Sequence, residues 1–389
     1  MKKDIFQWNH KSSESLSIVR FPGFCDVHVH LREPGFSFKG TIQTETLSGA
    51  SGGYTALCAM PNLKPVPDSL DHLKVEEDLI KKEGLIPVYP YGAVTQGQEG
   101  RELSDIFGLA PRVVGFSDDG HGIQDEAVMK KAMEKIQKTG KLLACHCEVN
   151  ALSKDGYIHE GPYSRAHDHI GIPNSSEWKE VERDIRLSFD TGCPLHICHV
   201  STRESIDLIR QAKKDGVNVS CETAPHYLLL DEGDLKEDGR FKMNPPLASP
   251  EDRKAMIEGL TDGTVDMIVT DHAPHSQEEK ARGLAKSPFG IVGLETAFPL
   301  LYTFFVKKEI LSLEKLIDLM VYRPRARFGI PLDDSYSIFD LQNPYRIQSE
   351  NFHSLGKSTP FDGWEVYGKC LKTLVRGKTI YQAKGQEAL

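Results

Sequence analysis

Several common sequence features are missing from this 389-residue chain, and each absence narrows the class of protein. No apolar run approaches the roughly 20 residues of a membrane-spanning helix. The opening stretch, MKKDIFQWNHKSSES, contains lysines but lacks the apolar segment of a secretory signal peptide. Basic residues are outnumbered, with 47 Lys and Arg against 56 Asp and Glu, and the net charge of −9 argues against a nucleic-acid or anionic-membrane partner.

Cysteine pairs of the CxxC type are also absent, although the chain contains eight cysteines. Most of them lie in or beside apolar, strand-like runs. Buried, reduced thiols therefore fit the pattern better than a disulfide framework, and we expect a cytoplasmic protein. The eight are Cys25, Cys58, Cys145, Cys147, Cys193, Cys198, Cys221 and Cys370.

Short apolar runs alternate with amphipathic helical stretches from about residue 20 onward. Most runs are continuous in Val, Ile, Leu and Cys, which is typical of parallel strands covered on both faces. Eight such strand–helix units predict a (β/α)8 TIM barrel, and a doubly wound open sheet is the structural alternative. Nucleotide-binding variants gain no support, because neither GxGxxG after the first strand nor GxxxxGK[ST] is present. The runs are Gly23–Leu31, Tyr54–Met60, Pro87–Val94, Val113–Ser117, Leu142–Cys147, Pro194–Val200, Asn218–Ala224 and Asp266–Thr270.

The helical stretches have recognisable ends. Ser69–Lys82 and Asp125–Lys138 carry apolar residues at three- to four-residue spacing. The segment STRE, residues 201–204, has the sequence of a capping box, and Ser249 before Pro250 predicts an N-cap followed by a first-turn proline. Glycines before several strands are expected in the left-handed conformation that ends a helix. They are Gly84, Gly140, Gly192, Gly216 and Gly263.

Both ends of the chain depart from this repeating pattern. Ser335–Leu341 and Gly363–Tyr381 alternate polar and apolar residues, and Ile5–Trp8 and Leu16–Arg20 also have the pattern of short strands. We expect these segments to form one small, β-sandwich-like appendage beside the barrel. The predicted division is residues 1–21 for the N-terminal part of the appendage, 22–332 for a metal-dependent catalytic barrel and 333–389 for the C-terminal part of the appendage.

The run DVHVHLREPG, residues 26–35, begins as a strand and ends in a Pro-Gly turn. Because strand side chains alternate, His28 and His30 project to the same face, and Arg32 follows as a fixed positive group. Two imidazoles from one strand can bind a transition metal. A buried, hydrogen-bonded histidine pair explains the same pattern, so this run alone leaves both interpretations open.

Ionisable residues recur at the ends of the other predicted strands, where TIM barrels collect their chemistry. Burying so many without a metal would cost on the order of several kcal/mol each, whereas imidazoles and carboxylates suit zinc or a similar divalent ion. Six ligands exceed the need of one tetrahedral ion, so we expect two metals sharing a carboxylate and a hydroxide that hydrolyses a carbonyl compound. Alternation along the strand cannot choose between the two neighbouring aspartates. The set is His28, His30, Asp118 or Asp119, His146, His199 and Asp271.

Eight motifs follow one another from the first predicted strand to beyond the last. They are DVHVHLREPG (26–35), AMPN (59–62), GFSDDG (115–120), HCE (146–148), CHVST (198–202), KMNPPL (242–247), TDHAPH (270–275) and PFGIVGLETAFPLLYT (288–303). In this order the chain resembles the amidohydrolase superfamily and, within it, the class I, Asp-bridged dihydroorotases of the bacterial type. The resemblance covers roughly residues 22–330.

This resemblance implies the reversible cyclisation of N-carbamoyl-L-aspartate to (S)-dihydroorotate in de novo pyrimidine (UMP) biosynthesis. It further implies two zinc ions per subunit, a metal-bound bridging hydroxide and Asp271 as general acid and base. The implied ligands are His28, His30 and Asp271 for the first ion, His146 and His199 for the second, and Asp119 as the bridge.

A substrate site is implied as well. The residues concerned are His30, Arg32, Asn62, Asn244, His275, Phe289 and Gly290. Arg32, Asn62 and His275 would bind the substrate carboxylate, with Arg32 as a bidentate clamp. The others, apart from His30, would contact the pyrimidine ring, and the loop that carries Asn244 can close over the site.

Lysine is missing between Lys82 and Lys130. Dihydropyrimidinases, hydantoinases and typical allantoinases bridge their metals with a carbamylated lysine from that region, so their kind of bridge is impossible here. Two alternatives stay open: another cyclic-amide hydrolase, allantoinase- or hydantoinase-like, and a catalytically silent homologue that partners a transcarbamoylase. The expected partners are a small-molecule substrate and either a second copy of the chain or a transcarbamoylase.

Other conspicuous residues receive no role. The polar segment 167–169, His-Asp-His, is expected to be solvated. Cys147 and Cys198 adjoin ligand histidines in the sequence, so strand alternation predicts that both point away from the metals, and the same holds for His272.

Overall fold

Eight parallel strands form the centre of the molecule in the computed structural model, which describes residues 18–386. Each strand lies within one of the eight apolar runs, and every residue of the first two is buried, as expected for strands covered on both faces. The strands are β2 (Phe24–Val29), β3 (Tyr54–Ala59), β4 (Val88–Pro90), β5 (Phe116–Ser117), β6 (Leu143–Cys145), β9 (Leu195–Ile197), β10 (Val219–Thr223) and β11 (Met267–Ile268).

The strands close into a ring. Regular pairing gives two parallel sheets, one in the order β2-β3-β4 and the other in the order β5-β6-β9-β10-β11. Parallel bridges between Gly92 and Phe116 and between Val29 and His272 join the two sheets at both seams. The predicted TIM barrel is therefore confirmed, and the open-sheet alternative is wrong.

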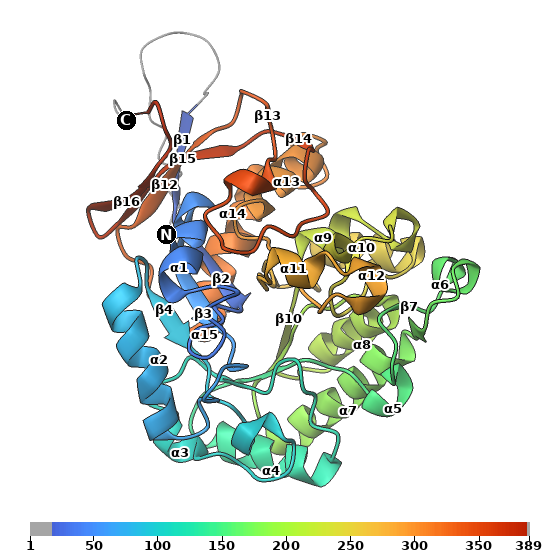
Figure 1. The fold of residues 1–389 in the computed structure, drawn as a ribbon. Helices are drawn as coiled ribbons and strands as arrows, with labels where there is room; N and C mark the ends of the chain where they lie inside the picture. The colour runs from blue at the N-terminus through green and yellow to red at the C-terminus, as the bar shows by residue number, and fades with distance from the viewer. Residues whose placement is uncertain (1–17, 387–389) are drawn as a thin grey trace.

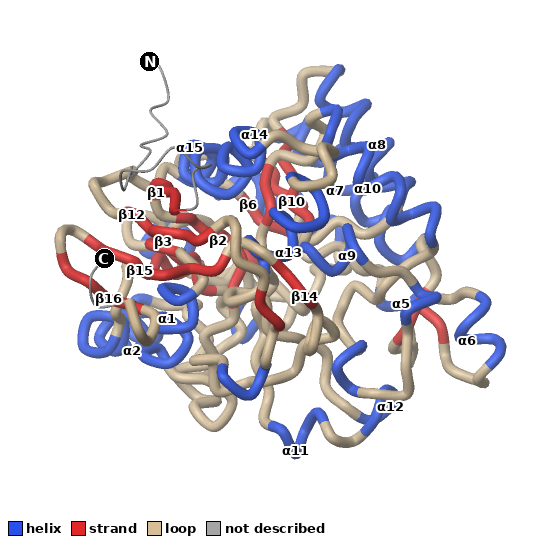
Figure 2. Tube along the Cα trace, turned by 90° about the horizontal axis from the view of Figure 1, so that it is seen from above, coloured by secondary structure: helices blue, strands red, loops and turns tan. Residues whose placement is uncertain are grey.

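Helices follow the strands and cover the outside of the barrel. Figure 2 shows α7, α8 and α10 side by side along one edge, where they also contact one another. These covering helices are α1 (Ile42–Ser51), α2 (Leu70–Glu83), α3 (Ile106–Leu109), α4 (Glu126–Gln137), α7 (Ser175–Thr191), α8 (Arg203–Lys214) and α10 (Pro250–Asp262). After β11 come α13 (Ala297–Leu301), η4 (Tyr302–Val306), α14 (Leu313–Ile317), η5 (Asp318–Tyr322) and α15 (Arg323–Phe328), of which η4 and η5 are π-helical.

Three of the predicted helix starts are confirmed. The side chains of Ser69 and Asp125 accept hydrogen bonds from the first turns of α2 and α4. Ser249 caps α10 ahead of Pro250 and forms a full capping box with Asp252. Gly192 and Gly263 end their helices in the left-handed conformation, as predicted.

One predicted helix start and one predicted helix C-terminus are wrong. Residues 201–204 form no capping box, because Ser201 and Thr202 donate their backbone and hydroxyl hydrogens to the buried carboxylate of Glu177 instead. Gly84 is extended, with φ of −67°. Glycine is needed there for space, since a Cβ would lie 2.6 Å from the carbonyl oxygen of Ile80.

Loops at the C-terminal ends of the strands contain short elements of their own. In Figure 1, α9, α11 and α12 lie close together, and α6 projects to one side. The elements are η1 (Gln96–Gln98), α5 (Asn150–Ser153), β7 (Ile158–His159), α6 (Pro162–Ala166), β8 (Gly171–Ile172), α9 (Pro225–Leu229), η2 (Glu232–Asp234), η3 (Gly239–Phe241), α11 (Gln277–Lys280) and α12 (Gly283–Lys286).

Both ends of the described chain build a β appendage. Its antiparallel sheet has the order β1-β12-β15-β16, with β1 (Ile18–Pro22), β12 (Tyr336–Asp340), β15 (Lys369–Val375) and β16 (Lys378–Gln382). A ribbon of β13 (Tyr345–Arg346) and β14 (Glu365–Val366), with η6 (Ser349–Asn351), completes this part. The chain ends meet in one sheet, as predicted, whereas the predicted strand Ile5–Trp8 lies outside the described residues.

An aromatic cluster joins the appendage to the barrel. Phe21 and Phe339 from the sheet pack against Phe24 of β2 and Phe298 of α13, with ring centroids 4.5 to 6.4 Å apart. Thr373 also donates a 2.7 Å hydrogen bond to the carbonyl of Ala50 in α1. The appendage therefore shares its core with the barrel.

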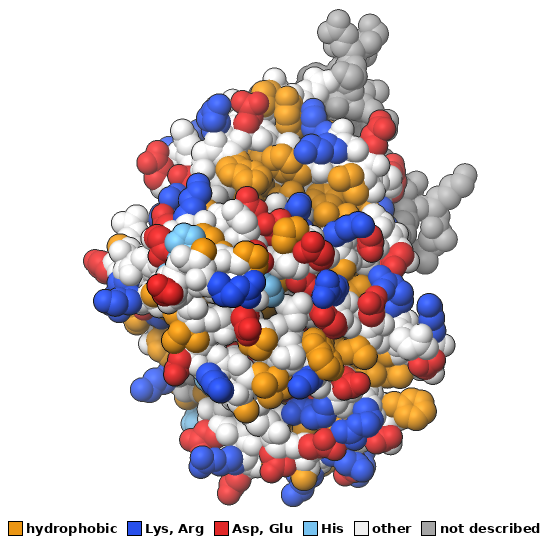
Figure 3. Space-filling model, turned by 90° about the vertical axis from the view of Figure 1, so that its right-hand side faces the viewer, with side chains coloured by type: hydrophobic (Ala, Val, Ile, Leu, Met, Phe, Trp, Pro, Cys, Tyr) orange, Lys and Arg blue, Asp and Glu red, His pale blue; other side chains and the backbone are white. Residues whose placement is uncertain are grey.

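The surface and the cysteines agree with the composition. On the face drawn in Figure 3, acidic and basic side chains are interspersed, without a continuous basic area. All eight cysteines are free and buried, which confirms the expected thiols. Among residues 18–386, no helix combines the length and apolar character that crossing a membrane requires.

Candidate metal and substrate site

The strand-end residues predicted from the sequence converge at one end of the barrel. A cleft of about 180 Å³ opens there, and every predicted site residue except His28 lines it. His28 lies beneath the cleft and is fully buried. The lining residues are His30, Arg32, Asn62, Asp119, Gly120, His146, His199, Asn244, Asp271, Ala273, His275, Phe289 and Gly290.

Asp119 is at the centre of the cluster. Its carboxylate oxygens lie 3.4 Å from His28 Nε2, 3.5 Å from His30 Nε2 and 3.5 Å from His199 Nε2. His146 Nδ1 is 3.8 Å from the same carboxylate and 2.9 Å from His199 Nε2. One aspartate thus faces the four predicted histidines.

Asp271 faces the pair of histidines from the first strand. Its Oδ1 lies 3.1 Å from His30 Nε2 and 3.5 Å from His28 Nε2. Burial alone would raise the pKa of Asp271, but the hydrogen bond from His30 and the charge of His28 outweigh it and lower the pKa below 3.8. This carboxylate is therefore ionised at neutral pH.

The donors of the cluster fit a divalent transition metal. His28 Nε2 and Asp119 Oδ1 are buried, yet neither forms a hydrogen bond in the described part of the chain. His28, His30 and Asp271 bring ligand atoms within 4.8 Å of one another, as do His28, Asp119 and His199. Imidazole nitrogens and carboxylate oxygens are the donor set that zinc and similar ions accept.

The structure distinguishes between Asp118 and Asp119, which the alternation of strand side chains could not do. Asp118 turns away from the cluster and accepts hydrogen bonds from the backbone of Val94 and from Thr95. Asp119 turns toward the histidines. Burial would raise its pKa, but the nearby His28, His199 and His30 outweigh burial and hold the pKa well below 3.8. Of the two aspartates, Asp119 is thus the one that faces the four predicted ligand histidines.

Strained backbone accompanies the candidate site. Arg32, His199 and Asp271 have φ values of 67°, 31° and 47°, in the left-handed region that residues other than glycine rarely adopt. Such conformations persist where surrounding structure enforces them, and they cluster at functional sites. They also break the strict alternation of strand side chains at these positions.

This break explains an error in the sequence analysis. Cys198 was expected to point away from the metals, but its sulfur lies within 4.8 Å of a ring nitrogen of His28, a predicted ligand, and of an oxygen of Glu222. Cys147 does turn outward, toward Asp184, and His272 turns toward Glu45, 2.7 Å away.

Glu222 is a site residue that the sequence analysis missed. Its Oε1 lies 2.5 Å from His28 Nδ1, and its Oε2 lies 2.9 Å from His196 Nε2. A carboxylate on Nδ1 fixes the tautomer of His28 and leaves Nε2 free to face Asp119 and the metal position. The available signal was a charged residue inside the apolar strand β10, where burial requires a partner.

The residues that the resemblance implies for carboxylate binding lie beside the cluster of histidines and aspartates. Arg32 Nη2 lies 3.2 Å from His275 Nε2, and Asn62 Oδ1 lies 2.8 Å from His30 Nδ1. Lys39, which the sequence analysis did not single out, donates to His275 Nδ1 at 3.2 Å. Burial, together with the charges of Arg32 and Lys39, lowers the pKa of His275 to about 2, so its ring is neutral.

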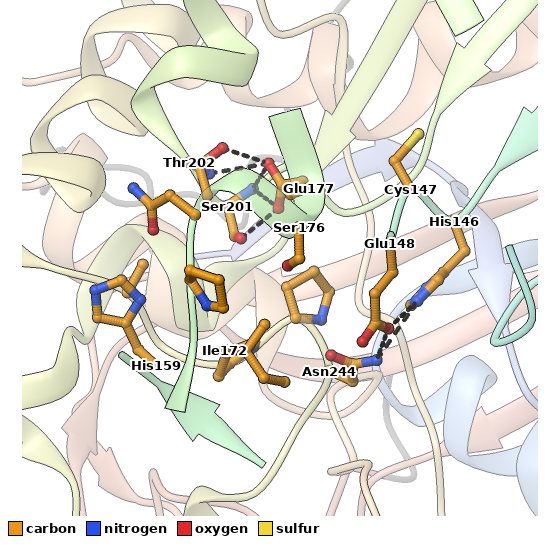
Figure 4. Close-up of a pocket in the computed structure, with 15 residues that line it drawn as sticks. His146, Cys147, Glu148, His159, Ile172, Ser176, Glu177, Ser201, Thr202 and Asn244 are labelled. Carbon is orange, nitrogen blue, oxygen red and sulfur yellow. Dashed lines mark hydrogen bonds and ion pairs between the residues drawn. The ribbon is translucent and has the colours of Figure 1, made fainter. Parts of the chain in front are cut away.

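Asn244 reaches the cleft from the loop after β10. Figure 4 shows its amide next to Glu148 and His146, in a small neighbouring pocket. Asn244 Nδ2 donates to Glu148 Oε2 at 2.7 Å, and the same oxygen lies 3.0 Å from His146 Nε2. Glu148 is a second residue that the sequence analysis missed, and it links the loop to a predicted ligand.

The segment 167–169 is more ordered than expected. His167 is exposed, but His169 Nε2 lies 2.8 Å from Glu237 Oε1, and its Nδ1 lies 2.8 Å from the hydroxyl of Tyr157. These contacts connect the projecting segment that contains α6 to the loop that leads to Asn244. The prediction of a purely solvated segment is wrong for His169.

A closed parallel barrel with four histidines and two aspartates at the C-terminal strand ends defines a class of protein, the TIM-barrel amidohydrolases. Comparisons with known proteins narrow this class. A model of the dihydro-orotase-like family matches residues 18–205. Relatives named dihydroorotase from Bacillus cytotoxicus and Bacillus cereus are each 46% identical over 370 residues, which is 93% of this chain and 86% of theirs. The chain belongs to the dihydroorotase family of the amidohydrolase superfamily.

Solved structures show the same architecture. An L-hydantoinase (dihydropyrimidinase) from Arthrobacter aurescens superimposes with a TM-score of 0.83 at 27% identity, over 94% of this chain and 85% of the other. A dihydropyrimidinase from Brevibacillus agri gives a TM-score of 0.81 at 22% identity, over the same shares of the two chains, and this likeness shows the fold alone.

Proposed function

We propose that this protein interconverts N-carbamoyl-L-aspartate and (S)-dihydroorotate in pyrimidine biosynthesis, with two zinc ions per chain. One observation carries the proposal: the cluster of metal-type donors and the subsite around Arg32 open into the same cleft. Dihydroorotate carries both an amide to hydrolyse and a carboxylate to hold. The 46% identity to proteins named dihydroorotase supports the same reaction.

Hydantoin hydrolysis is the second candidate, because an L-hydantoinase shares the fold at 27% identity. Hydantoin has no carboxylate for Arg32 to bind. The chain also has no lysine between Lys82 and Lys130 that could be carbamylated, whereas Asp119 faces the four histidines. Both features favour dihydroorotate.

The proposed mechanism assigns metal binding to His28, His30, His146, His199, Asp119 and Asp271. When bound, the two ions would polarise the ring amide carbonyl and lower the pKa of a nearby water. Arg32 would hold the substrate carboxylate through two parallel hydrogen bonds, with Asn62 and His275 beside it, and this fixes the ring against the donors.

Asp271 moves the proton in this proposal. In ring opening, its ionised carboxylate accepts a proton from the attacking water and delivers it to the ring nitrogen as the amide C–N bond breaks. In ring closure the same carboxylate takes a proton from the ureido nitrogen and returns it to the oxygen that leaves as water. Asp271 is ionised at neutral pH, so its carboxylate is free to accept this proton.

We also propose that the reaction takes place in the cytoplasm, where the eight buried thiols stay reduced. The catalytic barrel would span residues 22–332, with the appendage built from residues 1–21 and 333–389. The chain would act as a homodimer or together with a transcarbamoylase. Sedimentation of the purified chain, alone and mixed with a transcarbamoylase, tests this part.

The decisive experiment compares two substrates in two proteins. Zinc-loaded wild type should consume dihydroorotate, followed as loss of ring absorbance, faster than hydantoin. Arg32→Met should lower kcat/KM for dihydroorotate about 100- to 1,000-fold, because a bidentate charged contact is lost, and should leave any hydantoin turnover unchanged. Faster turnover of hydantoin than of dihydroorotate by the wild type would contradict the proposal.

A further inference from the structure

Lys280, the last residue of α11, is a buried cation without an acidic partner. Its side chain is almost completely covered, with 6% of the residue exposed, and no ion pair with a carboxylate is found in the described part of the chain. All of its hydrogen bonds go to backbone carbonyls: to Lys242 at 3.1 Å, to Pro288 at 3.0 Å and to Gly290 at 2.8 Å. One ammonium group therefore joins two segments distant in the sequence.

These two segments are the ones that carry the proposed ring contacts. Phe289 lies between two of the carbonyls that Lys280 binds, and its own carbonyl accepts a 2.6 Å hydrogen bond from His275 Nε2. Asn244 follows closely after Lys242, whose carbonyl also accepts from the backbone N–H of Gly290 at 3.1 Å. The carbonyls of residues 288–290 are thus all bound by side chains of the loop after β11.

Regular structure does not hold this part of the cleft. Residues 288–290 belong to neither a strand nor a helix. An ammonium group is expensive to bury, and burial, followed by the charge of Lys242, lowers the pKa of Lys280 to about 7. Three carbonyl acceptors replace the hydration that the ammonium loses. The contact that results fixes the position of both segments, as the support behind a binding site must.

We propose that Lys280 is a positioning residue that sets the affinity for the pyrimidine ring, an inference that rests on the proposed function. It does not line the cleft; it acts through the segments 242–244 and 288–290. Without the ammonium, only the backbone hydrogen bond from Gly290 to Lys242 joins the two segments directly, so Phe289 and Gly290 are held less firmly relative to Asn244 and the ring binds more weakly. The metal donors stand on strand ends that Lys280 does not contact, so the chemical step keeps its geometry.

Lys280→Met tests this proposal, with Lys286→Met as the matched control. Lys286 is exposed and belongs to the neighbouring helix α12. Lys280→Met should raise KM for dihydroorotate about tenfold and change kcat less than about threefold, whereas Lys286→Met should change neither. Amide hydrogen exchange should be faster around Gly290 in Lys280→Met alone. Lys280→Gln, which keeps two N–H donors without the charge, should give an intermediate KM.

The opposing results are distinct. If Lys280→Met lowers both kcat and Tm but leaves KM unchanged, Lys280 is only a structural residue and the proposal is overturned. Unchanged amide hydrogen exchange at Gly290 would overturn it as well. If Lys280→Met does not fold, Lys280→Gln decides by the same two measurements. If the wild type fails to turn over dihydroorotate, the proposed function falls, while faster exchange at Gly290 in Lys280→Gln still supports the positioning role.

Discussion

The two sides of the cleft are held in place by different means. On the metal side, the donors end the strands of a closed sheet, and carboxylates such as Glu222 fix their rings from behind. On the ring side, segments 242–244 and 288–290 belong to no strand; one backbone hydrogen bond joins them, from Gly290 to Lys242, and the side chains of His275 and Lys280 add the further contacts. The strand register positions the first side, and single side chains position the second.

This difference predicts how each side fails. Removing a donor on the metal side takes away the chemistry while the sheet behind it remains. Removing a side chain such as Lys280 on the ring side should leave the chemical step intact and weaken substrate binding. Metal content and kcat therefore report on one side, and KM reports on the other.

Asp119→Asn should have the largest effect, because it removes the carboxylate that faces four histidines. We expect metal content to fall below about one ion per chain and kcat to fall at least about a thousandfold, equivalent to ~4 kcal/mol. Elemental analysis and dihydroorotate turnover measure both. Asp118→Asn is the matched control, since Asp118 binds Val94 and Thr95 and should keep its metal. Equal metal loss in the two variants would contradict the placement of Asp119.

Glu222→Gln tests the support behind the metal side. An amide can still contact His28 but carries no charge, so we expect metal affinity to fall about 10- to 100-fold, as is typical when the partner of a ligand histidine is changed. Titration with a chelator measures this affinity. Glu295→Gln should leave this affinity unchanged, because Glu295 is a partly buried glutamate near the appendage that accepts hydrogen bonds from Ser48 and from the backbone of Ser354.

Sequence alone predicted that these histidines and aspartates converge, because period-two alternation and the barrel rule together specify which residues meet at the rim. The prediction failed where the backbone leaves the regular strand. Left-handed residues such as His199 re-aim neighbouring side chains, so Cys198 came closer to His28 than alternation allowed. Glu222 was missed because its role depends on a histidine far away in the sequence.

On the ring side, only the family resemblance named Asn244, Phe289 and Gly290, since no local pattern distinguishes them from other loop residues. The tether Lys280 has the sequence context of an exposed helix end. Lys280 is buried because three loops pack around it, and the periodicity of the sequence does not predict such packing. Packing between distant segments also explains why no capping box forms at residues 201–204: Ser201 donates its hydroxyl hydrogen to Glu177 instead.

Gly290→Ala tests the ring side directly. Gly290 has φ of +127°, and a Cβ there would lie 2.8 Å from Ala273 and 3.0 Å from His275 Nε2. Both the strain and the clash shift the segment, so we expect KM for dihydroorotate to rise about tenfold, or ~1.4 kcal/mol, with metal content unchanged. Gly377→Ala is the control, because Gly377 also has positive φ but open space around it. An equal rise in KM for both variants would disprove a local effect.

Glu76→Met should have the smallest effect on activity, and it contrasts with Glu222. Glu76 in α2 is buried, yet its carboxylate has no hydrogen bond in the described part of the chain, so burial raises its pKa well above 4.5. A raised pKa in the folded state means that the contribution of this carboxyl to stability is present below pH 4.5 and is lost as the pH rises through the raised pKa. Methionine removes this dependence and a buried polar group that costs about 1–3 kcal/mol.

Glu76→Met should therefore raise Tm more at pH 8 than at pH 5, with kcat and KM unchanged. Asp78→Asn, an exposed position in the same helix that pairs with Lys74, should change Tm little at either pH. A lower Tm for Glu76→Met at pH 8 would mean that Glu76, like Glu222, has a partner it stabilises. Burial of a carboxylate would then not distinguish a residue of the site from any other. The expected rise in Tm would show that Glu76 stabilises no partner, in contrast to Glu222, which contacts His28.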